Sequence, residues 1–300
     1  MSHLARGPVY GDRQQGECRC HRREVDGCSE YMTEVVGGTM RIFRVAVITA
    51  CLAITACATQ SAEDSGRQSS SPAGNETQDR MRARVHTELA GGYYEIGNIG
   101  VALEEVKEAL SADPHYGPAH NIAGLVYSLL KDDRLAEQSF QRALDINSAD
   151  SDANNNYGEF LCQRKREEEA IRYFMAAVRN PLYQTPERSF VNAGVCARRR
   201  GDLAGAENYF QLALKLRPAQ TQALYQMADL SYARGDDNGA RTYLGRLTQV
   251  AQVGPEVMWL GVRVSRRLRD RNSEASYALQ LRNKFPNSPE TRALNAGQYE

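Results

Sequence analysis

A repeat of about 34 residues begins at residue 83 and runs almost to the end of the 300-residue chain. Such a period is typical of arrays in which each unit contacts only its neighbours. Six units begin at Ala83, Gly117, Ser151, Glu187, Thr221 and, less sharply, near Glu256. Because a single unit cannot bury its apolar face alone, the pattern predicts a stack of similar units.

Three positions within the unit repeat in register. Position 8 is small in the first five units, at Ala90, Gly124, Gly158, Gly194 and Ala228. Position 20 is alanine in all six, at Ala102, Ala136, Ala170, Ala206, Ala240 and Ala275. Position 24 is apolar, at Val106, Phe140, Phe174, Phe210, Leu244 and Leu279. Small residues at positions 8 and 20 allow two helices to approach closely, and the larger residue at position 24 fills the gap to the next unit.

This pattern resembles the tetratricopeptide repeat, a helix-turn-helix unit of about 34 residues. Glycine at position 15, as in Gly97, Gly201 and Gly235, permits the turn between the helices. Proline at position 32, as in Pro114 and Pro218, ends the second helix. The resemblance implies an all-α fold. We expect a tetratricopeptide-repeat (TPR) superhelix of six helix-turn-helix repeats over residues 81–290, with a tail over residues 291–300, after a disordered N-terminal segment.

Two segments depart from the regular period. Residues 180–186 add two residues between the third and fourth units, so we expect a longer loop and a local bend there. The sixth unit slips in register and is rich in arginine, at Arg263, Arg266, Arg267, Arg269 and Arg271. A terminal repeat needs a polar outer face, so these arginines are interpreted as a solvated cap. Contact with an acidic lipid or partner is the alternative.

The N-terminal region carries an export signal at residues 40–56. The longest apolar run, Val45–Ala56, has twelve residues, whereas a membrane-spanning helix needs about 20. Arg41 and Arg44 precede the run, which is typical of a signal peptide. Residues 1–39 lack periodicity and lie upstream of this signal. They are interpreted as a disordered extension outside the true coding start, with Met40 as the initiator.

The end of the apolar run resembles the lipobox of bacterial lipoproteins, in the stretch Ile54-Thr55-Ala56-Cys57. The resemblance implies lipidation at Cys57 and an anchor in the membrane. An ordinary signal peptide or an uncleaved anchor with a chance cysteine is the alternative. Ala58 favours the outer membrane by resemblance to known sorting rules. Residues 57–80 are rich in Ser, Gly, Gln and charge, so we expect a flexible lipidated tether.

No pattern indicates catalysis or nucleic-acid binding. Lys and Arg number 37, as do Asp and Glu, and the resulting net charge of zero disfavours nucleic acid as a partner. No phosphate-binding glycine loop and no activated nucleophile is recognised. We therefore expect no catalytic residue, no metal, no cofactor and no small-molecule substrate.

Several His and Cys residues have metal-binding or disulfide alternatives. Upstream, Cys18, Cys20, His21 and Cys28 have irregular spacing, which disfavours a metal site. His86 and His120 share position 4 of neighbouring units, where packing is expected and a two-histidine site is the alternative. Cys162 and Cys196 occupy different positions within their units, so buried free thiols are favoured over a disulfide.

The expected function is protein binding along the first helices of the repeats. In such arrays, positions 2, 5, 9, 12 and 13 line the concave side. The predicted groove residues are Thr87, Tyr94, Asn121, Leu125, Asn155, Glu159, Cys162, Val191, Val195, Tyr225 and Asp229. Amide and tyrosine side chains suit an extended or helical peptide, and the apolar members add contact area.

Four short stretches are more specific than the repeat pattern. They are NNYGEFL at 155–161, LY and PERS at 182–189, MADLSY at 227–232 and ASYALQL at 275–281. With the lipobox and six repeats, they resemble the type IV pilus biogenesis/stability lipoprotein, the six-repeat TPR pilotin of the pilus secretin. The resemblance implies a non-enzymatic outer-membrane lipoprotein on the periplasmic face. It would bind secretin subunits and promote their localisation and multimerisation. A general periplasmic TPR scaffold lipoprotein for another envelope assembly machine, or an enzyme hidden in the array, is the alternative.

Overall fold

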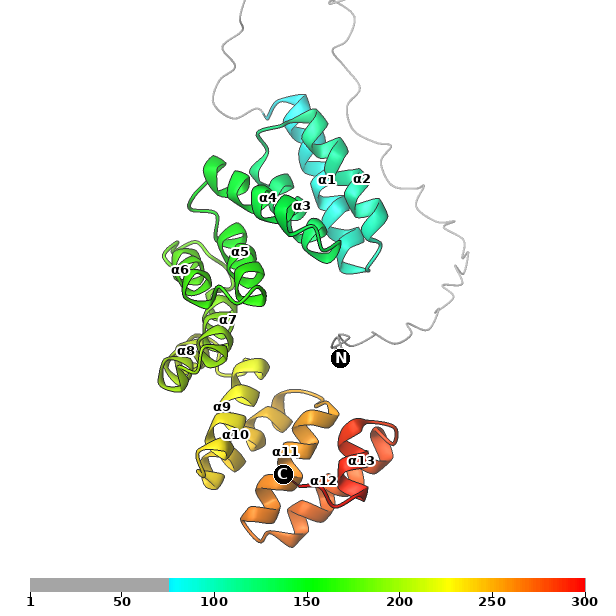
Figure 1. Cartoon of the computed structure of the whole chain (residues 1–300), viewed down its shortest axis with the longest axis vertical. Helices are drawn as coiled ribbons and strands as arrows, with labels where there is room; N and C mark the ends of the chain where they lie inside the picture. Colours follow the sequence, from blue (N-terminus) through cyan, green and yellow to red (C-terminus); the bar gives the residue numbers. More distant parts are fainter. Residues whose placement is uncertain (1–75, 300) are drawn as a thin grey trace, which may run out of the picture. The chain divides into compact units, whose positions relative to one another are not determined.

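The structure, a computed structural model, describes residues 76–299, so the expectations for the extension, the signal and Cys57 lie outside the described residues. The described part contains thirteen α-helices and no strand, which confirms the predicted all-α repeat fold (Figure 1). The helices are α1 (Gln78–Glu95), α2 (Ile99–Ala112), α3 (Gly117–Leu129), α4 (Asp133–Ile146), α5 (Ser151–Gln163), α6 (Glu167–Ala177), α7 (Pro186–Arg199), α8 (Leu203–Leu216), α9 (Thr221–Ala233), α10 (Asp237–Val250), α11 (Pro255–Arg267), α12 (Arg271–Lys284) and α13 (Pro289–Asn295). Helices α1 to α12 form six successive antiparallel hairpins, one for each predicted unit.

Aspartates fix where the second helix of most hairpins begins. The carboxylates of Asp132, Asp202, Asp236 and Asp270 each accept the backbone N–H three residues further on, at the starts of α4, α8, α10 and α12. This side-chain cap satisfies one of the free N–H groups at a helix N-terminus. The same short turn therefore recurs along the array.

The core of each regular hairpin is a contact between positions 8 and 24. Phe210 is fully buried, and a Cβ atom placed on Gly194 would lie 2.5 Å from its ring. Phe140 faces Gly124 in the same way, at 2.6 Å. These distances are below van der Waals contact, so glycine is required for the close helix approach. The position-20 alanines of the first five units are fully buried, as predicted.

The sixth hairpin corrects the sequence alignment. Gly261 faces Tyr277, with a built Cβ 2.9 Å from the ring, in a contact like that of the regular hairpins. Helix α11 begins at Pro255 and α12 at Arg271, so the unit begins one residue earlier than Glu256. Assigning Ala275 and Leu279 to core positions is wrong, because Ala275 is exposed and Leu279 is 59% exposed.

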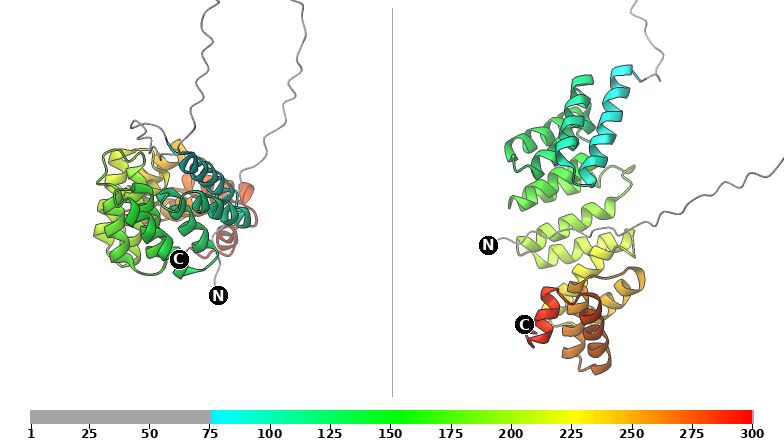
Figure 2. Two further views of the ribbon diagram at one scale, coloured as in Figure 1. Left: turned by 90° about the horizontal axis from the view of Figure 1, so that it is seen from above. Right: turned by 90° about the vertical axis from the view of Figure 1, so that its right-hand side faces the viewer.

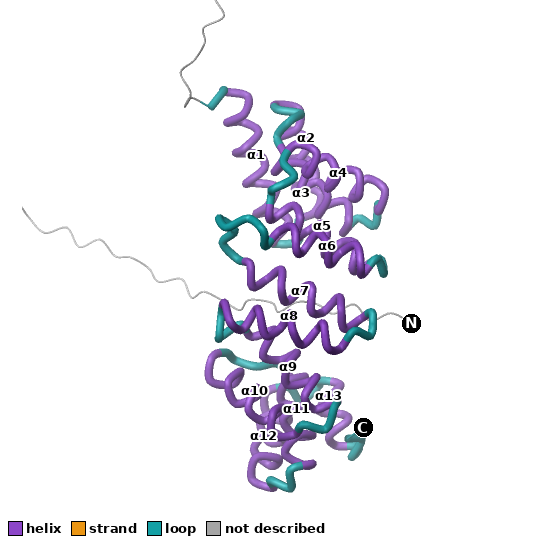
Figure 3. The backbone as a smooth tube through the Cα atoms, turned by 90° about the vertical axis from the view of Figure 1, so that its left-hand side faces the viewer, coloured by secondary structure: helices purple, strands orange, loops and turns teal. Residues whose placement is uncertain are grey.

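The structure also extends the expected boundaries at both ends. Helix α1 begins at Gln78, within the stretch assigned to the tether, and α13 crosses residue 290, where a tail was expected. Leu294 of α13 is buried, and α13 packs against α11 and α12. The connection over residues 178–185 is long, as expected, and is a loop between α6 and α7 (Figure 3). Within residues 76–299, no helix is long and apolar enough to cross a bilayer.

The turn inside each hairpin contains one residue in the left-handed region. Three of the six are glycines, including Gly201 at φ 87°, and the others are Lys131, Lys165 and Arg269 at φ 64°, 63° and 58°. All six fall at the same position of the turn. A side chain with a Cβ is strained there, by about 1–2 kcal/mol.

Lys165→Gly is therefore expected to raise the free energy of unfolding by about 0.5–1 kcal/mol, because relief of this strain exceeds the added chain entropy of glycine. Urea unfolding followed by circular dichroism measures the change. The reciprocal control, Gly201→Ala, should lower stability by a similar amount. A destabilised Lys165→Gly variant would show that the lysine is not strained.

Candidate partner-binding surface

The first helices of the hairpins form one continuous face. Helices α1, α3, α5, α7, α9 and α11 contact one another in sequence. Among the described residues, the second helices of the hairpins make no such contacts with each other; each packs only on the helices before and after it in the chain. Successive hairpins therefore lie closer together on the side of the first helices. The right-hand view of Figure 2 shows the hairpins stacked one after another along the chain. We call the exposed and half-buried side chains of these six helices the inner surface.

The predicted groove residues divide into two groups. Six are half-buried or exposed on the first helices, namely Tyr94, Leu125, Glu159, Val195, Tyr225 and Asp229. Five are buried, namely Thr87, Asn121, Asn155, Cys162 and Val191. The hydroxyl of Thr87 donates to the carbonyl oxygen of Ala83 in its own helix, at 2.7 Å. The first group can meet a partner directly, whereas the second supports the surface from behind. The binding role of both groups stays a prediction.

A ladder of amides lies beneath the centre of the inner surface. The side chain of Asn156 donates to Asn121 at 3.2 Å, which links α5 to α3. Asn155 accepts hydrogen bonds from Ser189 at 2.9 Å and Asn192 at 3.1 Å, which links α5 to α7. The side-chain oxygens of Asn121 and Asn155 are thus engaged within the protein, and peptide binding by these two residues stays a prediction. The run of three asparagines at 154–156 was the available signal, since asparagine is a poor helix former without such a role.

Charged residues alternate across the inner surface. Arg198 of α7 reaches Asp229 of α9 at 2.5 Å and donates to Gln226 at 2.7 Å. Arg188 of α7 lies 4.0 Å from Glu159 of α5. Sequence reasoning missed the two arginines because it considered only one position of the repeat at a time. Such alternating charges can orient a bound segment and select against wrong partners.

The electrostatic environment of Tyr94 shows how the hairpins face one another. Burial raises the pKa of the Tyr94 phenol, Glu159 raises it further, and Arg188 opposes both. Tyr94 belongs to the first hairpin, whereas the two charged residues belong to the third and fourth. Charges of the third and fourth hairpins therefore act on the Tyr94 phenol.

A disulfide joins two neighbouring inner helices. Cys162 of α5 and Cys196 of α7 are bonded, with a Cα–Cα distance of 5.8 Å, so the expected free thiols are wrong. The hydrogen bond between Ser189 and Asn155, at positions 3 and 5 of their units, shows the same offset of two, so α5 and α7 face each other with unlike positions paired. A cavity of about 90 Å³ opens beside the bond, between Glu159, Asn192 and Val195 among others. It has room for a small side chain of a bound segment.

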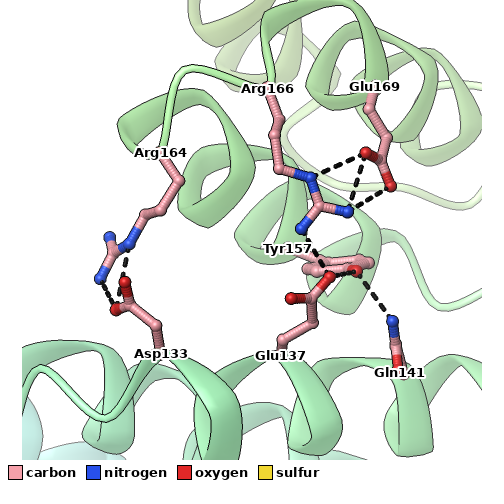
Figure 4. Close-up of polar contacts among 7 residues, drawn as sticks. All are labelled: Asp133, Glu137, Gln141, Tyr157, Arg164, Arg166 and Glu169. Atoms are coloured by element: carbon pink, nitrogen blue, oxygen red, sulfur yellow. Dashed lines mark hydrogen bonds and ion pairs between the residues drawn. The ribbon is translucent and has the colours of Figure 1, made fainter.

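A polar cluster on the other side of α5 fixes the second hairpin against the third (Figure 4). The hydroxyl of the buried Tyr157 donates to Glu137 of α4 at 2.9 Å and accepts from Gln141 at 3.2 Å. Arg166, at the start of α6, contacts Glu137 at 2.6 Å and Glu169 at 2.9 Å. Burial raises the pKa of Tyr157, and the bond to Glu137 raises the pKa of Arg166. The cluster thus holds α5 rigidly between its neighbours.

The histidines do not come together as a metal site. His86 lies 2.7 Å from the carboxylate of Glu105, and His120 lies 2.9 Å from the carbonyl oxygen of Pro114. Over residues 76–299, no group of three or more His, Cys, Asp and Glu is placed to hold a metal ion.

Comparison with known proteins agrees with the repeat fold described above. Models of the tetratricopeptide repeat match residues 87–151, 134–184 and 197–257. The type IV pilus assembly protein PilF of Pseudomonas aeruginosa is 32% identical over 212 residues, which cover 71% of this chain and 84% of PilF. A solved PilF structure from that organism has a TM-score of 0.67 at 30% identity, and the match covers 74% of this chain and 100% of the chain in that structure. The crystal structure of PilW, described as a widely conserved type IV pilus biogenesis factor, has a TM-score of 0.64 at 29% identity, covering 71% and 97% of the two chains.

Proposed function

Because this chain belongs to the TPR family of type IV pilus assembly proteins that includes PilF, we propose that it serves type IV pilus biogenesis by binding a protein of the pilus machinery. The likeness to PilF carries this proposal, because it extends over 84% of that protein and so over the whole array rather than one repeat. TPR arrays are protein-interaction modules, and the inner surface supplies the site.

The partner in this proposal is a subunit of the pilus secretin. Apolar side chains such as Leu125 and Val195 alternate on the inner surface with charged ones such as Glu159 and Arg198. This mixture suits an extended or helical segment of a partner. The rigid ladder under the surface supports the proposal, because a preformed groove loses less entropy when it binds.

Lipid attachment at Cys57 gives the proposal its mechanism. Each buried methylene of an acyl chain contributes about 0.8 kcal/mol to membrane binding, so several chains hold a protein durably. Twenty residues separate Cys57 from the first residue of α1, Gln78. An anchored array would confine secretin subunits to the periplasmic face of the outer membrane. It would thereby raise their local concentration and speed assembly without covalent chemistry.

Cys57→Ser in the full-length protein is expected to reduce its content in the outer-membrane fraction at least about tenfold, because the acyl anchor is lost. Cys51→Ser, in the preceding apolar run, is the matched control and should remain membrane-bound. Fractionation and immunoblotting measure the distribution. Retention of the Cys57→Ser variant would contradict the anchor.

Purification from detergent-solubilised envelopes tests the partner. Secretin subunits should co-purify with the wild-type chain, and fewer should co-purify when Tyr94 and Val195 are changed to charged residues. Recovery of a different envelope machine without secretin would instead support the general scaffold.

A further inference from the structure

The C-terminal residues fold back onto the sixth hairpin. Helix α13 ends at Asn295, and Gly297, at φ 69°, reverses the chain. Tyr299 then stacks on Trp259 of α11, with ring centroids 5.6 Å apart and planes 24° from parallel. Trp259 is the single tryptophan of the chain.

The ring of Tyr299 is held between an aromatic face and a cation. The guanidinium of Arg266, about two helical turns along α11 from Trp259, lies 3.9 Å from the Tyr299 ring centroid. Within the described residues the Tyr299 side chain makes no hydrogen bond, and the last backbone bond of the tail is from Gln298 to the carbonyl of Ala293, at 2.9 Å. The ring is therefore held by stacking, by the cation–π contact and by packing against the apolar cluster of α11 to α13, without a directional hydrogen bond. An occupant held in this way can be exchanged.

The guanidinium of Arg263, one helical turn along α11 from Trp259, has no ion pair among residues 76–299. Arg266 pairs with Glu274 at 3.0 Å, and Arg267 pairs with Asp237 at 3.1 Å. Arg263 forms no ion pair with any described carboxylate, and its buried Nε has no hydrogen-bond partner among residues 76–299. Its guanidinium lies 5.9 Å from the Trp259 ring. A carboxylate beside the aromatic occupant would satisfy this donor.

The same arginine joins the C-terminal pair to the inner surface. Arg263 also lies 4.9 Å from the ring of Tyr232 in α9. Burial raises the pKa of the nearby Tyr225, and the carboxylates of Asp229 and Glu256 raise it further. The guanidinium groups of Arg263 and Arg198 lower it. A segment bound along α7 and α9 could therefore continue onto α11 without leaving the inner surface.

We propose that Trp259, Arg263 and Arg266 form a recognition site for a peptide that carries an aromatic side chain next to a carboxylate. The chain's own Tyr299 fills the aromatic position until a partner displaces it. Tyr299 is itself followed by a carboxylate residue, Glu300, in the sequence. The site goes beyond the function proposed above, because it does not require that the partner be a secretin.

Tryptophan fluorescence of the full chain tests whether the tail covers the site. Tyr299→Ala should shift the Trp259 emission to longer wavelength and increase its quenching by acrylamide about twofold, because the ring loses its cover. Tyr299→Phe keeps the stacking ring and should behave as wild type. An unchanged emission in Tyr299→Ala would overturn the proposal. So would a wild-type signal that depends on protein concentration, because the tail of a second copy would then be the occupant.

A synthetic peptide of residues 295–300, NAGQYE, tests recognition. It should bind the Tyr299→Ala chain saturably, and at least about tenfold more tightly than the wild type, in which the tethered tail competes. The peptide with alanine for tyrosine should not bind. Glutamine in place of glutamate should weaken binding several-fold in the Tyr299→Ala chain, and this difference should vanish when Arg263→Gln is added. No binding of NAGQYE at millimolar concentration, or no effect of the glutamate, would refute the site as proposed.

Discussion

Replacing Phe210 with alanine is expected to lower the free energy of unfolding by about 3–5 kcal/mol, which is among the largest effects of a single substitution in such a core. The side chain is fully buried and lies against Gly194, with Ala206 and Ala213 of its own helix in the same cluster. Truncation leaves a cavity that the two rigid helices cannot close. Urea unfolding followed by far-ultraviolet circular dichroism measures the loss.

Leu212→Ala is the matched control on the same helix. Leu212 is 41% exposed, so its truncation removes less buried area and should change stability by less than about 1 kcal/mol. Equal effects at the two positions would contradict the packing described for α7 and α8. A Phe210→Leu variant should fall between wild type and alanine, because leucine refills part of the cavity.

Much of the fold could be predicted because one contact is repeated. A glycine and an aromatic residue sixteen positions apart recur as Gly124 with Phe140 and Gly194 with Phe210, and both pairs meet in the structure. The predicted core positions of the sixth unit were wrong because Ala275 matched the alanine pattern by chance. Gly261 and Tyr277 carried the correct spacing in the printed sequence. An alignment built on the contact, rather than on one residue type, would have placed the unit correctly.

Less of the candidate site could be predicted, because it depends on how neighbouring hairpins sit against each other. The repeat pattern places Asn121 and Asn155 on the first helices, but not the cross-helix bonds that bury them. The pairing of Arg198 with Asp229 likewise depends on the distance between α7 and α9. Such contacts are absent from the pattern of a single unit. A regular repeat fixes the scaffold, and the side chains between repeats give this array its own surface.

The disulfide shows the same limit and leads to the second large effect. Position numbers within the repeat separate Cys162 from Cys196 by two residues, yet α5 and α7 pack with just this offset and bring them together. The bond closes a loop with a sequence separation of 34. For a loop of this length, the chain-entropy model gives a stabilisation of about 4 kcal/mol, because the cross-link restricts the unfolded chain. In the folded protein the bond joins the third hairpin to the fourth.

Reduction of the wild-type protein is therefore expected to lower its free energy of unfolding by about 4 kcal/mol. Urea unfolding with and without dithiothreitol measures the shift in midpoint. The double variant Cys162→Ala/Cys196→Ala is the control, because it should start at the reduced stability and should not respond to dithiothreitol. A wild-type midpoint that does not move on reduction would show that the two sulfurs are not bonded. Because α5 and α7 carry the centre of the inner surface, hydrogen exchange should also speed up in these helices before it changes in α1 or α11.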